Sequence, residues 1–426
     1  MLRMNTPPTQ LSIDDAALER RYRKVRAVSL DLAAPLSDAD ATVQSMPDAS
    51  PAKWHLAHTS WFFESMVLIP HGANYRTFDE RFNFLFNSYY ESVGARQPRP
   101  LRGMLTRPTL REVLAYREHV DAAMDRLFMQ RPAPCVLKVV ELGCHHEQQH
   151  QELLLTDILH LFAQNPLRPA YRESVPLPVE VIDRSQTYRS FPSGLFEIGH
   201  HGGGFAFDSE GPRHGVQVEA YRLADRLVTN REWAEFIADG GYRNPLLWLS
   251  DGWARVLSEA WSAPLYWEQR EGEFWTMTLR GAQPVDPDSP VTHVSYFEAD
   301  AFATWAQRRL PTEAEWEIAA QPLRVAGNFA SSARLRPKPA PVAAGELRQM
   351  FGDVWEWTRS AFLPYPRFRP MEGALGEYNG KFMSGQFVLR GGSCVTPEDH
   401  VRATYRNFFA PHARWQFSGL RLAEDA

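Results

Sequence analysis

Residues 136–162 decide the fold of this chain and read VLKVVELGCHHEQQHQELLLTDILHLF. An apolar stripe runs through the stretch and predicts one long helix from about Val136 to Phe162. Within it, His146 and His150 stand four residues apart, so their side chains share one helical face, about 5–6 Å apart at Cβ. Two imidazoles in this arrangement can reach one metal ion. The helix is therefore both a packing element and a candidate metal site.

Three further helices are predicted upstream, each with its own start signal. Ser12-Ile-Asp-Asp offers an N-cap followed by acidic first-turn residues, Ser50 is a cap followed by Pro51 at the first helical position, and Thr109 caps the third. Four long helices with apolar stripes predict an antiparallel bundle. The expected bounds of these three helices are about residues 12–30, 51–68 and 110–128.

Glycine and tryptophan divide the chain into two parts. Only four of the 26 glycines precede residue 190, and only Trp54 and Trp61 of the 13 tryptophans precede Trp233. Because glycine is costly inside helices and useful in turns, we expect loops and short strands in the second part. The sequence thus predicts a helical bundle over residues 1–164, a proline-containing linker over 165–190 and an irregular α+β domain over 191–426. In this domain we expect strands at 196–198, 216–219 and 387–390, and helices at 230–237 and 296–307.

Composition excludes several classes of function. The 426 residues include 46 Lys+Arg and 51 Asp+Glu, a net charge of −5 with no basic run, which excludes an electrostatic footprint for nucleic acid. No window reaches about 18 uninterrupted apolar residues, so no membrane span is expected. Met1–Gln10 lacks the apolar stretch of a secretory signal. Three cysteines (Cys135, Cys144 and Cys394) are typical of a reducing compartment, so we expect a cytoplasmic protein.

A third histidine from the helix at 51–68 would complete the metal site. Both His55 and His58 lie there, and we select His58 because Ala57, Trp61, Phe62 and Met66 place it beside an apolar stripe. Any single histidine here could instead be a hydrogen-bonded core residue. The run from His146 to His150 also fits the zinc-peptidase pattern H-E-x-x-H, in which Glu147 would be the general base, although no metzincin-type ligand sequence follows it.

Tyrosines and arginines lie between these helices. Tyr89 and Tyr90 are adjacent and could supply phenolic protons beside a metal, or simply pack. Arg96, Arg99 and Arg102 follow, and a guanidinium suits a carboxylate through paired hydrogen bonds. Without a nearby metal site, solvated arginines would be the simpler interpretation.

Longer motifs around these residues resemble a known family. Trp54-His-Leu-Ala-His58-Thr-Ser-Trp-Phe-Phe-Glu64, Asn87-Ser-Tyr-Tyr90 and His146-Glu-Gln-Gln-His150-Gln-Glu152 resemble the DinB-like bundle of ergothioneine-biosynthesis sulfoxide synthases. The second part resembles a formylglycine-generating-enzyme-type, or sulfatase-modifying-factor, domain with a C-type-lectin-like fold. Its markers are Val228-Thr-Asn230, Gly240-Gly-Tyr242, Arg309-Leu-Pro-Thr-Glu-Ala-Glu-Trp-Glu317, Gly352-Asp-Val-Trp-Glu-Trp357 and Arg390-Gly-Gly-Ser393. The order of these motifs along the chain also matches.

This resemblance implies a non-haem iron(II) oxygenase. Such enzymes couple a thiol to C2 of the imidazole of Nα-trimethylhistidine (hercynine), using O₂ and oxidising the sulfur to a sulfoxide. By motif position, His58, His146 and His150 would hold the iron, and three protein ligands leave positions for substrates and oxygen. The implied partners are small molecules: hercynine, cysteine and O₂.

The resemblance also implies roles for other residues. Tyr89 and Tyr90 resemble the branch that places two tyrosines near the iron from the first domain, which implies proton delivery and cysteine as the thiol. The implied substrate-binding residues for hercynine are Gln149, Asn407, Phe408 and Phe409, with Phe408 or Phe409 flanking its trimethylammonium group. Arg99 is implied for the carboxylate of the thiol.

Several alternatives stay open. The same chemistry could use γ-glutamylcysteine, unmethylated histidine or a selenosugar, and the other classes are a metal-dependent thiol transferase and a non-catalytic binding protein. Formylglycine-generating enzymes bind copper with two cysteines, whereas Cys394 stands alone in its stretch, so that activity is not expected. The second domain is expected to close over the bundle and complete the pocket. Asp353 and Glu356 either bind a structural cation or stabilise a loop through hydrogen bonds.

Overall fold

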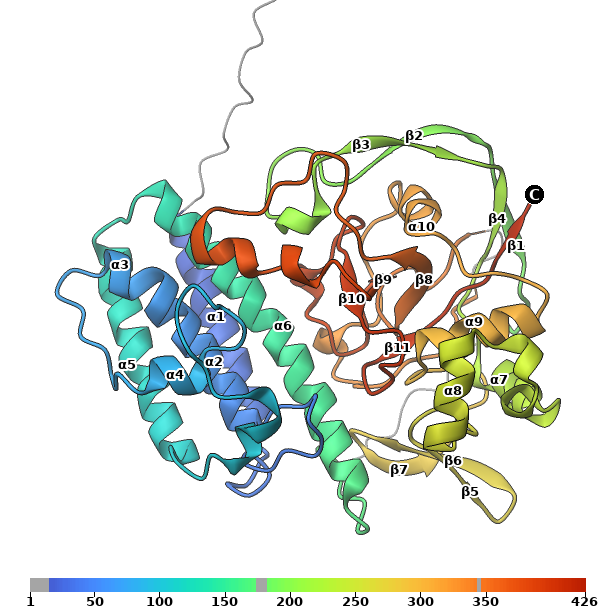
Figure 1. Ribbon diagram of the computed structural model, residues 1–426, viewed down its shortest axis with the longest axis horizontal. Helices are drawn as coiled ribbons and strands as arrows, with labels where there is room; N and C mark the ends of the chain where they lie inside the picture. The colour runs from blue at the N-terminus through green and yellow to red at the C-terminus, as the bar shows by residue number, and fades with distance from the viewer. Residues whose placement is uncertain (1–14, 174–181, 343–345) are drawn as a thin grey trace, which may run out of the picture.

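The N-terminal part of the protein is the expected helical bundle, seen in blue to green in Figure 1. The computed structural model describes residues 15–173, 182–342 and 346–426, so the predicted cap at Ser12 lies outside the described residues. The four long helices are α1 (Asp15–Ala33), α2 (Ala52–Phe63), α5 (Leu110–Met129) and α6 (Pro134–Gln164). Between α2 and α5 lie α3 (Ile69–His71), α4 (Phe82–Phe86) and a 3₁₀ turn, Arg99–Met104.

The helix starts show which local signals were reliable. Thr109 caps α5 as predicted, because its hydroxyl accepts the amide of Glu112 while the Glu112 carboxylate accepts the amide of Thr109. The prediction that Ser50 caps α2 is wrong: Pro51 occupies the cap position, and the Ser50 hydroxyl accepts from Arg102 Nη1 at 2.9 Å. The hydroxyl is thus engaged by a residue 52 positions away, which no local rule can anticipate.

The second helix reaches the predicted end at Leu68, but its α-helical hydrogen bonding stops at Phe63. After Phe63 the chain forms a π-helical turn, Glu64–Leu68, before α3 begins. The buried carboxylate of Glu64 accepts hydrogen bonds from the hydroxyls of Tyr75 and Tyr116, both at 2.5 Å. Single π turns inside helices are frequent at functional sites, and this one follows directly after the segment that carries His55 and His58.

Close packing between α2 and α6 sets the distance across the bundle. Gly143 on α6 faces Phe63 on α2, and a Cβ added to Gly143 would lie 2.5 Å from the Phe63 ring. A contact this short leaves no room for any other residue. The absence of a side chain at Gly143 therefore lets the two histidine-bearing helices approach one another.

The second part is a sheet-containing domain of irregular outline. Strands β10, β9, β8 and β11 form one sheet in that order, and smaller sheets have the orders β1-β4-β12, β2-β3 and β5-β6-β7. The three predicted strands fall in β2, β3 and β9, and the two predicted helices are α7 and α9. Helix α9 ends at Trp305, two residues before the predicted end, and Gln307 has a left-handed backbone conformation with φ 54°. The strand bounds are β1 (Tyr188–Phe191), β2 (Gly194–Ile198), β3 (His214–Val218), β4 (Tyr221–Ala224), β5 (Trp267–Arg270), β6 (Glu273–Thr278), β7 (Gly281–Pro284), β8 (Trp355–Ala361), β9 (Phe387–Arg390), β10 (Asn407–Phe409), β11 (Ser418–Gly419) and β12 (Ala423–Asp425). The helices are α7 (Asn230–Ala238), α8 (Ser250–Glu259), α9 (Tyr296–Trp305) and α10 (Glu313–Ala320).

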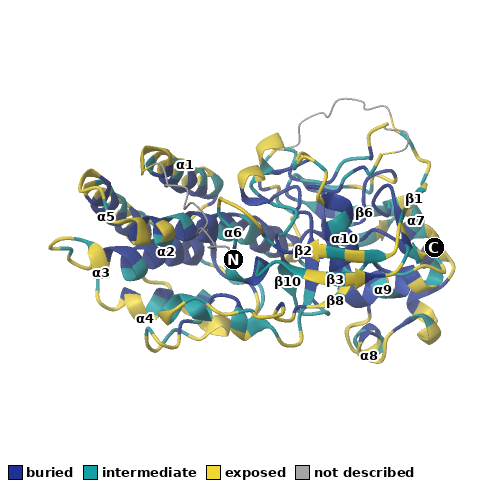
Figure 2. Cartoon of the chain, turned by 90° about the horizontal axis from the view of Figure 1, so that it is seen from above, coloured by how far each residue is buried: buried dark blue, intermediate teal, exposed yellow. Residues whose placement is uncertain are grey.

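Helix α6 lies between the bundle and the second domain (Figure 1), and much of it is buried (Figure 2). Its half-buried Glu152 accepts hydrogen bonds from Trp355 Nε1, Ser393 Oγ and Thr396 Oγ1, each at 2.7 Å. Three donors from the second domain thus hold the helix that carries two of the candidate ligands. Among the described residues, no helix is both long and apolar enough to cross a bilayer.

Candidate metal centre

Three histidine side chains converge between α2 and α6. His58 comes from α2 and His146 and His150 from α6, and one ring nitrogen of each lies within 4.8 Å of the others. Nε2 of His58 is 3.2 Å from Nε2 of His146. Two nitrogens that bind one ion at about 2.1 Å stand roughly 3.0–3.4 Å apart, so this separation fits a shared metal ion.

Burial and hydrogen bonding keep these imidazoles in a ligand-competent form. Nδ1 of His58 lies 2.6 Å from the carbonyl oxygen of Phe86 and must donate to it, which leaves the lone pair on Nε2. Burial lowers the pKa of His58 and of His150 well below 6.5, and lowers the pKa of His146 to about 3. Neutral imidazole is the form that binds metals, so the site combines three neutral nitrogen donors.

Glu147 does not face this site. Its carboxylate accepts hydrogen bonds from Arg26, Arg117 and Ser29 at 3.0, 2.8 and 2.6 Å inside the bundle. Burial alone would raise the pKa of Glu147, but the two guanidinium groups outweigh it and lower that pKa to about 2. A carboxylate that is paired twice and so weakly basic cannot take a proton from water near neutral pH. The zinc-peptidase interpretation of the His146–His150 run therefore fails.

The predicted tyrosines form a stacked pair near the site, with Tyr90 buried and Tyr89 half-buried. The rings of Tyr89 and Tyr90 lie 4.7 Å apart, and Tyr90 is 5.4 Å from Trp61, whose ring is in turn 5.4 Å from that of His58. Burial raises the pKa of both phenols, so both are protonated at neutral pH. The Tyr90 hydroxyl is buried and has no hydrogen-bond partner among the described residues.

Sequence reasoning missed Tyr378, which the second domain contributes. Its ring lies 5.7 Å from that of His146 in an edge-to-face arrangement. Its hydroxyl donates to Oε1 of Gln149, and Nε2 of Gln149 donates to the hydroxyl of Tyr405 at 2.7 Å. The amide of Gln149, between the two ligand positions on α6, thus points to the second domain. Nothing in the local sequence around Tyr378 marked it, because its position depends on how the two domains meet.

The other predicted hercynine contacts lie on strand β10. Phe408 stacks on Phe362 at 4.2 Å, Phe409 meets Trp415 edge-on at 5.9 Å, and Oδ1 of Asn407 accepts from the amide of Phe408. No measured contact joins these three residues to the histidines within the described chain. Tyr405, two residues before Asn407, provides the link to Gln149.

A buried arginine differs from the one that the sequence favoured. Arg99 is exposed, and its Nη2 donates to the carbonyl of Asp48. Arg102 is only 4% exposed, its guanidinium lies 3.4 Å from the ring centroid of Trp54, and among the described residues its Nη1 donates to the Ser50 hydroxyl while its Nε has no hydrogen-bond partner. Burial, reinforced by Arg99, lowers the pKa of Arg102 to about 8. A buried cation without a carboxylate partner is unusual. Arg102 is therefore a second candidate, beside Arg99, for binding the carboxylate of the thiol substrate.

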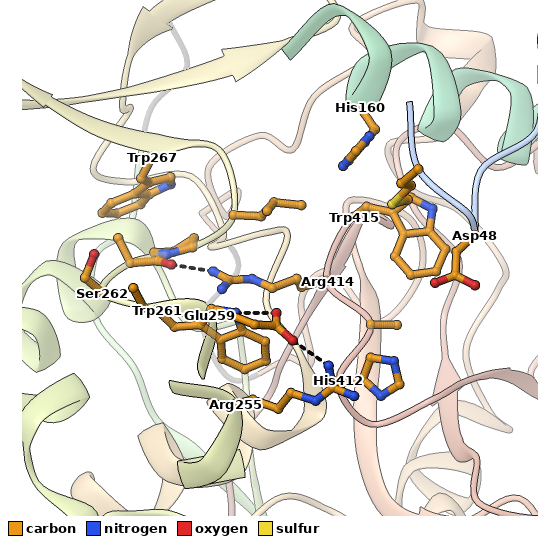
Figure 3. Close-up of a pocket in the computed structure, with 16 residues that line it drawn as sticks. Asp48, His160, Arg255, Glu259, Trp261, Ser262, Trp267, His412, Arg414 and Trp415 are labelled. Carbon is orange, nitrogen blue, oxygen red and sulfur yellow. Dashed lines mark hydrogen bonds and ion pairs between the residues drawn. The ribbon is translucent and has the colours of Figure 1, made fainter. Parts of the chain in front are cut away.

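A separate cavity of about 480 Å³ opens at the seam between the two parts of the chain. Figure 3 shows His160 of α6 and Asp48 facing Arg414 and Trp415 of the second domain across it. Arg414 donates to the backbone of Ala263 and is therefore already engaged. None of the three candidate ligands lines this cavity.

The remaining candidate groups of the second domain are held by internal contacts. Glu356 forms a buried ion pair with Arg421 at 2.9 Å, and Asp353 accepts from Asn328 at 2.7 Å and from the amide of Lys338 at 2.9 Å. These partners support the loop interpretation over a cation site. Cys394 is buried with a free thiol whose pKa is raised by burial, which makes it a poor nucleophile.

Comparisons with known proteins define the architecture and then the family. Residues 21–154 match the DinB superfamily, and residues 183–344 and 330–426 match the sulfatase-modifying factor enzyme 1-like domain, so the chain combines these two domain types. The hercynine oxygenase of Mycolicibacterium thermoresistibile is 34% identical over 448 residues, covering 98% of this chain and 96% of that relative. The hercynine oxygenase of Mycobacterium tuberculosis is 33% identical, covering 99% and 100%. The formylglycine-generating enzyme of Streptomyces coelicolor is 29% identical but covers only 55% of this chain. This chain belongs to the hercynine oxygenase family and is an oxidoreductase.

Proposed function

We propose that this protein is an iron(II)- and O₂-dependent sulfoxide synthase that joins cysteine to C2 of hercynine, giving hercynylcysteine sulfoxide in ergothioneine biosynthesis. The name of the relatives supports hercynine as one substrate. The observation that carries the proposal is the convergence of three neutral imidazoles, two buried and one half-buried, because such nitrogens suit Fe(II) and leave positions for substrates. The reaction balances with O₂ as a four-electron oxidant: the thiol and ring hydrogens leave as water, and the second oxygen stays on sulfur.

In this proposal His58, His146 and His150 hold the metal, and bound iron(II) would supply the capacity to activate O₂. His58 is already oriented for this task, since the Phe86 carbonyl fixes its tautomer. Zinc would suit the same nitrogens but has no redox chemistry, so the oxidoreductase assignment favours iron.

Hercynine would bind at the seam between the two domains. Gln149 is the contact closest to the ligands in sequence, and its hydrogen bonds to Tyr378 and Tyr405 aim its amide towards the second domain. Asn407 would hydrogen-bond the substrate, and Phe408 or Phe409 would flank its trimethylammonium group. Phe408 already belongs to an aromatic group with Phe362, an environment that attracts such a cation by roughly 0.5–2 kcal/mol.

The thiol substrate would be oriented through its carboxylate by arginine. Arg99 is the proposed contact. Arg102 is a second candidate, because it is buried and has no described ion-pair partner. Its guanidinium lies against the ring of Trp54, the residue that precedes His55 in the sequence. Tyr89 and Tyr90 would deliver protons to the reacting oxygen, because phenols are protonated at neutral pH and this stacked pair lies beside Trp61, which stacks on His58.

An anaerobic assay tests this function. Purified protein, Fe(II), hercynine and either cysteine or γ-glutamylcysteine are mixed without oxygen, O₂ is admitted, and products are identified by mass spectrometry. With cysteine as the thiol, hercynylcysteine sulfoxide should form only after O₂ is admitted. No sulfoxide from either thiol would defeat the enzyme assignment, and selective use of γ-glutamylcysteine would defeat only the choice of thiol. Replacing hercynine by histidine, or the thiol by a selenosugar, separates the related chemistries, and turnover without O₂ would indicate a thiol transferase.

A further inference from the structure

His55, which is not part of the trio, joins one of its members to a buried carboxylate. Nδ1 of His55 lies 2.8 Å from Nδ1 of His150, and Nε2 of His55 lies 3.0 Å from Oδ2 of Asp157. The side chains of His55 and Asp157 are only 4% and 7% exposed. The same Oδ2 atom accepts the backbone amide of Ser50 at 2.8 Å, which fixes the carboxylate in place.

The directions of these hydrogen bonds follow from the Asp157 carboxylate, which is the last group in the hydrogen-bonded series His150–His55–Asp157. An ionised carboxylate only accepts, so the proton between Asp157 and His55 lies on Nε2 of His55. When Nε2 of His55 holds the ring's single proton, Nδ1 of His55 carries a lone pair and accepts from Nδ1 of His150. The lone pair of His150 is consequently on Nε2, the nitrogen left for a metal ion. One carboxylate thus determines the tautomers of two histidines in series.

The three candidate ligands differ in what supports them. Nδ1 of His58 donates to the neutral backbone carbonyl of Phe86, and Nδ1 of His146 is buried without a hydrogen-bond partner among the described residues. Among the three, and within the described residues, His150 alone is connected to a carboxylate, through His55. His150 is also the least buried of the trio, so packing alone constrains it less than the other two.

We propose that Asp157 and His55 are a positioning pair that orients His150 and strengthens its Nε2 as a metal ligand, with His55 acting as a relay and not as a fourth ligand. This inference rests on the proposed metal-binding role of His150. Carboxylates that accept from metal-bound histidines fix ring orientation and raise ligand basicity, and losing them typically weakens metal binding 10- to 100-fold. Here the same effect is transmitted through an interposed imidazole.

Asp157→Asn tests the pair with little change of shape. Oδ2 of Asp157 accepts from both the Ser50 amide and Nε2 of His55, whereas Oδ1 is buried without a described partner. The amide of asparagine can therefore place its oxygen where Oδ2 lies and its NH₂ where Oδ1 lies. The variant therefore loses the charge and keeps the contacts. We expect its dissociation constant for Co(II) or Fe(II), measured anaerobically by competition with a chromophoric chelator, to rise about 10-fold or more.

Two variants of His55 and one control complete the test. His55→Leu removes the acceptor for His150 and should weaken metal binding at least as much as Asp157→Asn. In His55→Gln an amide can still donate to Asp157 and accept from His150, so this variant should bind metal more tightly than His55→Leu. Ser45→Ala removes a hydrogen bond to His160, farther along α6, and should leave metal affinity unchanged.

The outcomes separate the possible roles. Wild-type metal affinity in Asp157→Asn would overturn the relay, and weak binding in His55→Leu alone would identify His55 as a ligand instead. A melting temperature of the metal-free variants that falls in parallel with affinity would reduce the pair to a structural role and also overturn the proposal. If the wild-type protein binds metal and forms sulfoxide while all variants match it, only this inference fails. If the wild-type protein binds no metal, the proposed function fails as well.

Discussion

Neutralising Glu147 should destabilise the bundle and leave the chemistry in place. Its carboxylate is fully buried between Arg26 and Arg117, with ion-pair distances of 3.0 and 2.8 Å. A pKa of about 2, against an ordinary 4.5, corresponds to about 3 kcal/mol of stabilisation at neutral pH. Glu147→Gln leaves the buried Arg117 without an ion-pair partner among the described residues, while Arg26 keeps its pair with Asp121 at 2.7 Å. Breaking a buried pair typically costs about 3–5 kcal/mol.

The pH dependence gives this prediction its sign. Because the pKa of Glu147 is lowered on folding, its contribution is complete above pH 4.5 and is lost as the pH falls from 4.5 towards 2. Glu147→Gln should lack that part of the acid dependence and should lower the melting temperature at pH 7 by about 6–12 °C, for a cooperative unit of about 150 residues. Thermal unfolding followed by circular dichroism between pH 3 and 7 measures both effects.

Glu141→Gln is a matched control on the same helix. Burial raises the pKa of Glu141, so folding disfavours its charged form and replacement by the neutral amide should cost little stability. Metal binding by Glu147→Gln should match that of the wild type when measured below its melting temperature. A variant that melts like the wild type but has lost turnover would refute the reasoning, because it would restore Glu147 as a catalytic base.

Three further perturbations test the site. His146→Ala should abolish tight iron binding while circular dichroism shows the fold retained; stoichiometric iron in the purified variant would remove this residue from the ligand set. Tyr89→Phe and Tyr90→Phe should change the ratio of sulfoxide to simple oxidised thiol, measured by mass spectrometry, and an unchanged ratio in both would take the pair out of the mechanism. Arg102→Met should raise KM for the thiol about 10-fold or more with a smaller effect on KM for hercynine, whereas Arg99→Met should have the lesser effect because Arg99 is exposed; the reverse order would return the carboxylate to Arg99.

The sequence predicted best what depends on neighbouring residues. The Thr109 cap and the shared face of His146 and His150 are set by spacings of three and four residues, and both appear in the structure. The convergence of His58 with that pair required the further step that α2 faces α6 in a bundle. The structure brings these three side chains together, while their role as iron ligands stays a prediction.

What the sequence missed depends on contacts between distant segments. Ser50 failed as a cap because Arg102 engages its hydroxyl, and Tyr378 reaches His146 only because the second domain folds against α6. The sequence favours His58 over His55 as a ligand, but it does not indicate that His55 contacts Asp157, which lies 102 residues away in the chain. Hydrophobic stripes and cap motifs contain no information about such pairs.

The three donors from the second domain that meet Glu152 have a consequence for how such a protein can evolve or be rebuilt. A chimaera that took its bundle from one relative and its sheet domain from another would need to inherit the acid and its donors together, or the ligand-bearing helix would lose an anchor two residues from His150. The contacts of Glu152 therefore constrain recombination between the two domains, even when each domain folds by itself.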